Sequence, residues 1–352
     1  MDEKLFSIID ALEENHSLSL EEYEYLVAHR SDEGALILAD KARTIRDRIY
    51  GHDIFVRGLI EFSNICKNDC LYCGIRKSNR VCDRYRLSEA QILFCADAGY
   101  DLGFRTIVLQ SGEDGWFTDE RLCSIIKKIK KKHPDCAITL SLGERSRDSY
   151  QRLYDAGADR YLLRHETADE EHYKKLHPEE MSFAHRMQCL QDLRDVGFDV
   201  GAGMMVGSPY QTPHTLAEDL KFIEEFKPEM VGIGPFIPHR ETPFKDMPAG
   251  TLEETLYLLS IIRLIYPSVL LPATTALGTI DPTGREQGIL AGANVIMPNL
   301  SPVSVRRNYE LYNGKICMGE EGAECRQCLD VRMDHIGYTI KVDRGDIRRN
   351  AV

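Results

Sequence analysis

The chain has 352 residues, of which 43% are hydrophobic, and carries 44 Lys and Arg against 56 Asp and Glu, giving a formal net charge of −12. This acidic balance disfavours broad binding to nucleic acid or to anionic membranes. No apolar run approaches the roughly 20 residues of a transmembrane helix. There are 11 cysteines and no recognisable signal peptide, which favours reduced thiols in a cytoplasmic protein over a disulfide framework.

A helical region is expected over residues 2–49, after which strand-like and helix-like runs alternate. The expected strands are Ile54–Phe62, Thr106–Gln110, Ala137–Leu142, Arg160–Arg164, Val200–Val206, Met230–Phe236, Leu270–Thr275 and Asn294–Pro298. The expected amphipathic helices include Ser88–Leu102, Asp119–Lys132, Phe183–Val196, Thr215–Phe226 and Thr251–Ile265, several of which begin at an N-cap residue.

Repeated βα units predict an α/β fold with a parallel sheet and external helices. Eight such units over about 250 residues predict a closed (β/α)8 barrel of the TIM type, with an open doubly wound sheet as the alternative. The expected organisation is an N-terminal helical extension (1–50), the barrel (51–315) and a C-terminal cluster-binding loop and tail (316–352).

Three cysteines, Cys66, Cys70 and Cys73, follow the first expected strand with the spacing C-x3-C-x2-C. An electron-transfer 4Fe–4S cubane takes four thiolates, so three leave one iron open to a ligand. A zinc knuckle is the alternative, but it needs a fourth ligand, and His52 precedes the strand. The spacing therefore favours a 4Fe–4S cluster with one open iron.

This cysteine loop resembles that of the radical SAM enzymes. In that family the open iron binds S-adenosylmethionine, and an electron from a reductant such as ferredoxin or flavodoxin cleaves it to a 5′-deoxyadenosyl radical. The resemblance places Tyr72 against the adenine, where simple loop packing is the alternative. It also places Ser111 and Glu113 in the family's glycine-rich motif after the second strand, where an ordinary βα turn is the alternative.

Polar residues recur after the expected strands, and chemistry in a barrel occurs at the carboxyl ends of its strands. Gln110 ends the second strand, and Glu166 follows the fourth, where it could accept hydrogen bonds from ribose hydroxyls. Arg186, on the next helix, suits a carboxylate or is an ordinary solvated arginine. Arg164 lies in an apolar strand and is expected to be buried against an anionic substrate, or against Glu144 or Glu166.

A second triad, Cys317-x7-Cys325-x2-Cys328, follows the eighth strand among several glycines. Its spacing predicts a second iron–sulfur cluster, either 2Fe–2S or 4Fe–4S. A zinc site with the distant His335 and an unmetallated triad are the alternatives.

Longer motifs resemble the HydE family of [FeFe]-hydrogenase maturases across roughly residues 50 to 330. They are Ile60–Asn64, Arg84–Arg86, Thr106–Asp114, Ala158–Thr167, Val231–His239, Pro272–Ala276, Gly292–Asn299, Tyr309–Tyr312 and Gly314–Cys317. In that family the second cluster is variable and can be lost.

The resemblance implies that S-adenosylmethionine contacts Glu166, Arg186 and Met205. It implies that Arg164, Thr274 and Thr275 line a deeper substrate cavity, with Tyr309 at its mouth near both ligands. The implied activity is a step in assembling the di-iron subcluster of the hydrogenase, on a cysteine-bound iron carbonyl cyanide complex made by the maturase HydG, before the scaffold HydF.

The same resemblance implies an anaerobic organism and a monomeric enzyme. Three rival functions remain open at this point: a methylornithine synthase-like mutase, which is not expected to carry the second triad, a biotin synthase, and a non-catalytic iron–sulfur carrier. A biotin synthase needs cysteines inside the barrel, and the expected strands offer none there.

Overall fold

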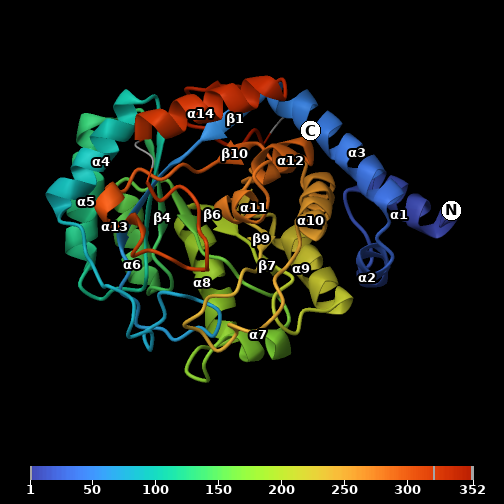
Figure 1. Cartoon of the computed structure of the whole chain (residues 1–352), viewed down its shortest axis with the longest axis horizontal. Coiled ribbons are helices and arrows are strands. Elements are labelled where there is room, and N and C mark those ends of the chain that lie inside the picture. The colour runs from blue at the N-terminus through green and yellow to red at the C-terminus, as the bar shows by residue number, and fades with distance from the viewer. Residues whose placement is uncertain (1, 320–321, 350–352) are drawn as a thin grey trace.

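The structure is a computed structural model that describes residues 2–319 and 322–349, without the side chains of 322–325. Its N-terminal helices are α1 (Glu3–Asn15), α2 (Leu20–Ala28) and α3 (Asp32–Tyr50). Ser19 and Glu22 form a capping box at the start of α2, which supplies hydrogen-bond partners to the free N–H groups of its first turn. α3 packs on α10 (Leu252–Ile265), and α2 packs on α9 (Pro213–Phe226), so this extension lies outside the barrel (Figure 1).

Six parallel strands form one sheet in the order β2-β3-β4-β5-β6-β8. Their bounds are β2 (Gly58–Ser63), β3 (Thr106–Ser111), β4 (Ala137–Ser141), β5 (Arg160–Leu162), β6 (Asp199–Ala202) and β8 (Met230–Val231). Buried aliphatic residues dominate them, as expected of strands covered on both faces. The predicted alternation of strands and helices is therefore confirmed.

Backbone contacts at both edges close this sheet into a barrel. Met230 of β8 bridges to Leu270, and Pro272 bridges to Val295 of β10 (Val295–Ile296). β10 pairs with β1 (Asp53–Val56), and Asn299 bridges to Leu59 of β2. The predicted eight-stranded TIM-type barrel is confirmed. The predicted seventh strand is shorter than expected, because Thr274 caps helix α11 (Thr275–Ile280) and ends the extended backbone.

Two predicted strands are each divided by a glycine. β7 (Met205–Val206) follows β6 and pairs with β9 (Gly234–Pro235), which follows β8. Gly203 has a φ of +148°, and a Cβ there would lie 2.1 Å from the carbonyl oxygen of Gly232. Only glycine lets the two backbones approach so closely.

The remaining helices surround the barrel or follow it: α4 (Glu89–Asp101), α5 (Asp119–Lys132), α6 (Arg147–Asp155), α7 (Glu170–Leu176), α8 (Phe183–Val196), α12 (Gly284–Leu290), α13 (Val303–Arg306) and α14 (Gly322–His335). Ser88 and Thr251 are N-caps as predicted, but α9 begins earlier than predicted. Its N-cap is Thr212, which precedes Pro213, a residue well suited to a first helical position.

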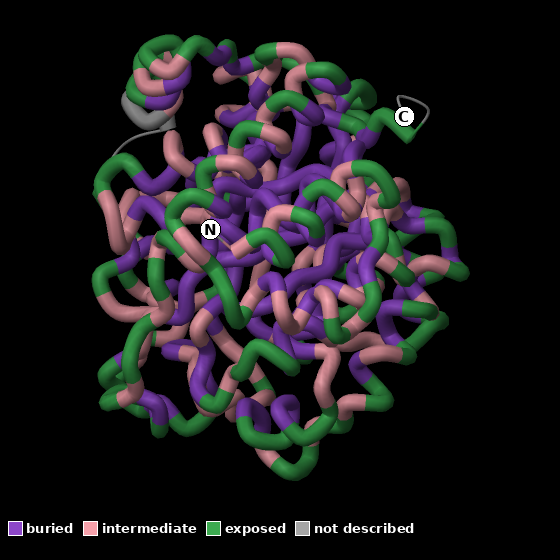
Figure 2. The backbone as a smooth tube through the Cα atoms, turned by 90° about the vertical axis from the view of Figure 1, so that its right-hand side faces the viewer, coloured by how far each residue is buried: buried purple, intermediate pink, exposed green. Residues whose placement is uncertain are grey.

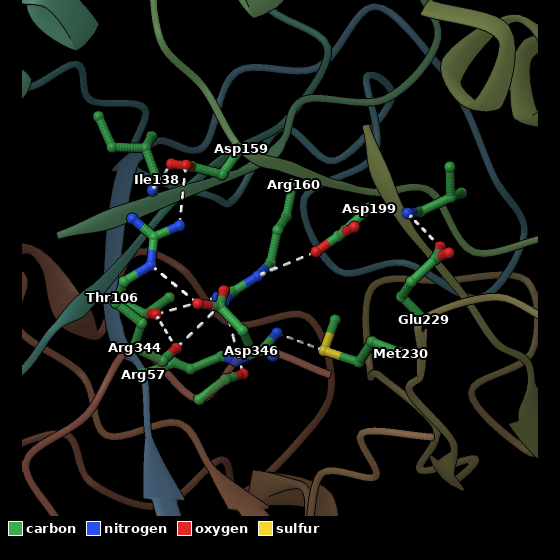
Figure 3. Close-up of polar contacts among 12 residues, drawn as sticks. Arg57, Thr106, Ile138, Asp159, Arg160, Asp199, Glu229, Met230, Arg344 and Asp346 are labelled. Carbon is green, nitrogen blue, oxygen red and sulfur yellow. Dashed lines mark hydrogen bonds and ion pairs between the residues drawn. The ribbon is translucent and has the colours of Figure 1, made fainter. Parts of the chain in front are cut away.

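The C-terminal tail closes the amino-terminal end of the barrel. β11 (Thr339–Lys341) pairs with β1, and the chain then passes beneath the strands. Arg160 of β5 donates to Thr106 of β3 at 3.0 Å and pairs with Asp346 of the tail (Figure 3). Arg344 reaches Asp159 at 3.0 Å. These charged groups lie across the amino-terminal end of the barrel.

Burial follows the layers of the fold. The strands and the inward faces of the helices are buried, and exposed residues lie on the periphery (Figure 2). Among the described residues, no helix combines the length and apolar character that crossing a membrane would require.

Candidate active site

A cavity of about 370 Å³ lies at the carboxyl ends of the strands and is lined by the first cysteine triad. Every residue that the sequence suggested as a contact for S-adenosylmethionine or substrate also lines it: Tyr72, Gln110, Ser111, Glu113, Arg164, Glu166, Arg186, Met205, Thr274, Thr275 and Tyr309. These residues come from segments more than 200 positions apart. The fold brings them into one chamber, although their individual roles stay predictions.

One partly buried arginine, Arg84, holds the loop that carries Cys66, Cys70 and Cys73. Arg84 donates to the carbonyl oxygens of Asn64, Ile75, Arg76 and Asn79, at 2.6 to 3.1 Å. One guanidinium thus satisfies four backbone acceptors of a segment that has no regular secondary structure. Sequence reasoning missed this role, because nothing in the sequence relates Arg84 to those carbonyls.

The three thiols are partly buried, and none forms a disulfide. Burial raises the pKa of Cys73 to about 12, so a nearby cation is needed to favour its thiolate. Across the described residues, no three His, Cys, Asp or Glu side chains converge on a single metal ion.

The turn after β3 lies directly against the cysteine loop. A Cβ on Gly112 would lie 2.4 Å from the carbonyl oxygen of Ile65 and 2.8 Å from Cβ of Cys66. The Glu113 amide donates to Cys66 Sγ at 3.4 Å. The Glu113 carboxylate accepts from the Glu144 amide at 3.0 Å and pairs with Lys67 at 2.9 Å. The Ser111 hydroxyl bonds to the Gly112 carbonyl at 2.7 Å.

Glu166 has a left-handed backbone and a buried carboxylate. Its φ is +66°, which is uncommon for a residue with a side chain and is often found at functional sites. Its Oε2 lies 3.4 Å from Arg164 Nη2, but neither atom has a hydrogen-bond partner among the described residues. The Arg164 side chain is 31% exposed, so its predicted burial is only partial, although its Nε and Nη2 atoms are buried. It follows β5 and faces the cavity, where solvent reaches it.

Arg186 is buried and fixed, so the alternative that it is an ordinary solvated arginine is wrong. It donates from Nε to Glu144 at 2.6 Å and from Nη1 to the Arg164 carbonyl at 2.6 Å. Two of its donors are thus held by the protein. The buried ion pair links α8 to the loop after β4 and orients the guanidinium at the cavity wall.

Thr274 and Thr275 lie at the start of α11, and Thr274 Oγ1 is a buried atom without a hydrogen-bond partner in the described structure. A Cβ on Gly234 would lie 2.7 Å from that oxygen, so the glycine keeps the space beside it open. Unpartnered buried polar atoms are costly unless a ligand or water meets them. Thr274, Arg164 and Glu166 are therefore suited to a polar ligand.

Tyr72 and Tyr309 lie far apart in the sequence but line the same cavity. The Tyr72 hydroxyl lies 3.2 Å from His177 Nε2, and the Tyr309 hydroxyl accepts from Gln110 at 3.3 Å. Burial raises the pKa of each tyrosine well above its ordinary value, so both are neutral. Sequence reasoning did not identify His177.

The sequence matches known radical SAM proteins. Residues 60–223 match the family model for the radical SAM superfamily. The chain is 44% identical over 318 residues to the [FeFe] hydrogenase maturase subunit HydE of Thermotoga maritima, covering 90% of each chain. This chain belongs to the HydE family of radical SAM enzymes. As a member it is an enzyme, and the superfamily's cofactors are a 4Fe–4S cluster and S-adenosylmethionine.

Two further similarities lie outside the HydE family. A 3-methylornithine synthase of Methanosarcina acetivorans is 29% identical and covers 84% of this chain and 85% of its own. The crystal structure of methylornithine synthase (PylB) matches with a TM-score of 0.84 at 25% identity, covering 95% of this chain and 97% of that one. The methylornithine synthases therefore share the barrel fold with this chain. The sequence identity to the HydE protein is higher, at 44% against 29%, and this difference assigns the chain to the HydE family.

The second cysteine triad is divided between a loop and a helix. Cys317 precedes α14, whereas Cys325 and Cys328 lie within that helix, and the Cys325 side chain is outside the described residues. Arg285 donates to Cys317 Sγ at 3.3 Å, and Arg332 interacts electrostatically with both Cys317 and Cys328. Nearby cations of this kind favour thiolates.

Proposed function

We propose that this HydE-family enzyme acts in building the di-iron subcluster of [FeFe]-hydrogenase, on a cysteine-bound iron carbonyl cyanide complex. The observation that carries the proposal is the 44% identity to a HydE maturase along nine-tenths of both chains. The chamber is compatible with it, because its inner wall offers an anionic or accepting group a guanidinium and a threonine hydroxyl whose buried atoms have no hydrogen-bond partner among the described residues.

The proposed site divides into two parts. Cys66, Cys70 and Cys73 would hold the cluster, and Glu166 and Arg186 would bind and orient S-adenosylmethionine. When bound and reduced, these cofactors supply a 5′-deoxyadenosyl radical. The charged floor formed by Arg160 and the tail would limit the entry of water from the other end of the barrel, which would protect a reactive species.

We propose that the inner chamber holds the substrate. Arg164, Thr274 and Thr275 would bind its carboxylate or cyanide group there, and Tyr309 would separate it from the cofactor. The proposed partners are HydG, which would supply the complex, HydF, which would accept the product, and an electron donor such as ferredoxin or flavodoxin. The second triad would hold an auxiliary iron–sulfur cluster.

Anaerobic reconstitution tests the proposal. The purified protein with iron, sulfide, S-adenosylmethionine and dithionite should form 5′-deoxyadenosine. Added to HydG, HydF and an apo-hydrogenase, it should give active hydrogenase, and omitting it should abolish that activity. Formation of 5′-deoxyadenosine without maturation would contradict the assigned substrate.

A further inference from the structure

A buried ion pair in the chamber belongs to neither part of the proposed site. Lys315 Nζ contacts Oε1 of Glu61, and their side chains are 7% and 1% exposed. Glu61 belongs to β2, whereas Lys315 lies in the segment between α13 and α14. Both residues line the cavity that the cysteine triad also lines. Figure 1 shows the segment between α13 and α14.

Glu61 is held in place from several sides. Its Oε2 accepts from Asn299 Nδ2 at 2.8 Å. Its amide donates to Ser301 Oγ at 2.8 Å, and its carbonyl oxygen accepts from the Tyr85 hydroxyl at 2.6 Å. A carboxylate fixed in this way gives Lys315 a defined position rather than a flexible one.

Lys315 uses only part of its hydrogen-bonding capacity within the described residues. It donates to Glu61 and to the Tyr309 carbonyl, the latter at 2.9 Å. An ammonium group has three N–H donors, so these two hydrogen bonds leave one N–H without an acceptor, and the Tyr309 ring centroid lies 5.0 Å from Nζ. The chamber that Lys315 lines is the place where such an acceptor can bind.

Stability alone does not explain the pair. A buried ion pair pays a desolvation cost, and replacing both members by apolar residues of similar size is often neutral or stabilising. The fold could therefore close this segment over the barrel with apolar contacts instead. A charged pair in the chamber instead points to a ligand with a strong acceptor.

We propose that Lys315 is a second cationic contact for the substrate, donating its remaining N–H to an anionic or strongly accepting group, and that Glu61 is its positioning residue. This inference rests on the proposed function. It gives the proposed substrate part of the chamber two separate cations, Arg164 and Lys315, and therefore favours a substrate with two accepting groups, such as a carboxylate and a metal-bound cyanide.

The test uses the reconstituted enzyme with a Lys315→Met/Glu61→Gln double variant. This variant removes both charges together, so neither charged group is left buried without its partner. The HydG reaction product is titrated as the probe in the hydrogenase maturation assay. The concentration for half-maximal maturation should rise about 10- to 100-fold, the effect of losing one hydrogen bond to a charged group. Formation of 5′-deoxyadenosine and the thermal midpoint should stay near wild type. A single Lys315→Arg variant, which keeps the cation, should recover part of the lost affinity.

A matched control is Lys221→Met/Glu224→Gln, which removes a half-buried ion pair on α9 away from the chamber. It should leave the titration unchanged. Two results would overturn the inference. One is an unaltered titration for the Lys315 double variant. The other is a joint loss of cofactor cleavage and thermal stability, which would show that the ion pair stabilises the fold and does not bind substrate. Failure of the wild-type enzyme in maturation would instead contradict the proposed function.

Discussion

His177 Nε2 lies 3.2 Å from the Tyr72 hydroxyl, and its Nδ1 lies 3.0 Å from the Tyr173 carbonyl oxygen. A carbonyl can only accept, so Nδ1 carries the proton and Nε2 accepts from Tyr72. These hydrogen bonds fix a tyrosine within the cysteine loop, between Cys70 and Cys73. It requires a neutral imidazole, which burial favours by lowering the pKa of His177 to about 3.

The His177 pKa predicts how stability changes with pH. The ordinary histidine pKa is near 6.5, so between about pH 6.5 and pH 3 the unfolded chain binds a proton that the folded chain does not. Stability therefore falls as the pH falls through this window, by at most about 1.4 kcal/mol per pH unit from this group. Urea unfolding of wild type and His177→Gln at pH 7.5 and pH 5 should show a smaller loss in the variant. Equal losses in both proteins would contradict the neutral assignment.

A substitution at Gly112 tests whether iron binding depends on the position of the cysteine loop. In Gly112→Ala the new Cβ would meet the Ile65 carbonyl at 2.4 Å, so the loop must shift, at a cost of about 1–3 kcal/mol. Iron bound after reconstitution should fall. Gly115→Ala is the matched control, because a Cβ there has no neighbour within 4 Å. Full iron content in the Gly112 variant would show that the loop tolerates displacement.

The barrel was predictable from local patterns in the sequence, whereas most members of the chamber were implied by the resemblance to the HydE family. Aliphatic runs define buried strands, and parallel strands bring their carboxyl ends to one rim. Long-range side-chain partners were not predictable. Arg84 reaches four carbonyls and Lys315 reaches Glu61 over 254 positions, and no periodicity encodes such pairs. Exposure at a strand end was also misjudged, since Arg164 lies beyond β5 and not within it.

Removing one cysteine of the first triad should abolish cofactor cleavage. In Cys70→Ser a thiolate anchor of the cluster is missing, so the open-iron cubane should not assemble. The measurement is 5′-deoxyadenosine formation with dithionite. Cys95→Ser, at a buried cysteine on α4, is the control and should remain active. Wild-type rates from Cys70→Ser would make the assignment of this loop wrong.

The role of the second cysteine triad should be separable by mutation from that of the first. Replacing Cys317, Cys325 and Cys328 together by Ser should lower bound iron but leave cofactor cleavage largely intact, because neither Cys317 nor Cys328 lines the chamber. Iron analysis and 5′-deoxyadenosine formation on the same sample provide the two readouts. If a folded triple variant lost all cleavage, the triad would have to act in catalysis or shape the active site.

Arg164→Met tests whether the chamber binds an anion. Arg164 is 31% exposed and lies 3.4 Å from Glu166 without a hydrogen bond, so its loss should change stability by no more than about 1 kcal/mol. If its partner is a substrate group, 5′-deoxyadenosine formation should persist while hydrogenase maturation falls about 10- to 100-fold. If its partner is Glu166, the variant leaves that 7% exposed carboxylate without its nearest cation, and the thermal midpoint should drop steeply. Thermal unfolding without ligand, compared with wild type, separates the two cases, and a steep drop would contradict the substrate assignment.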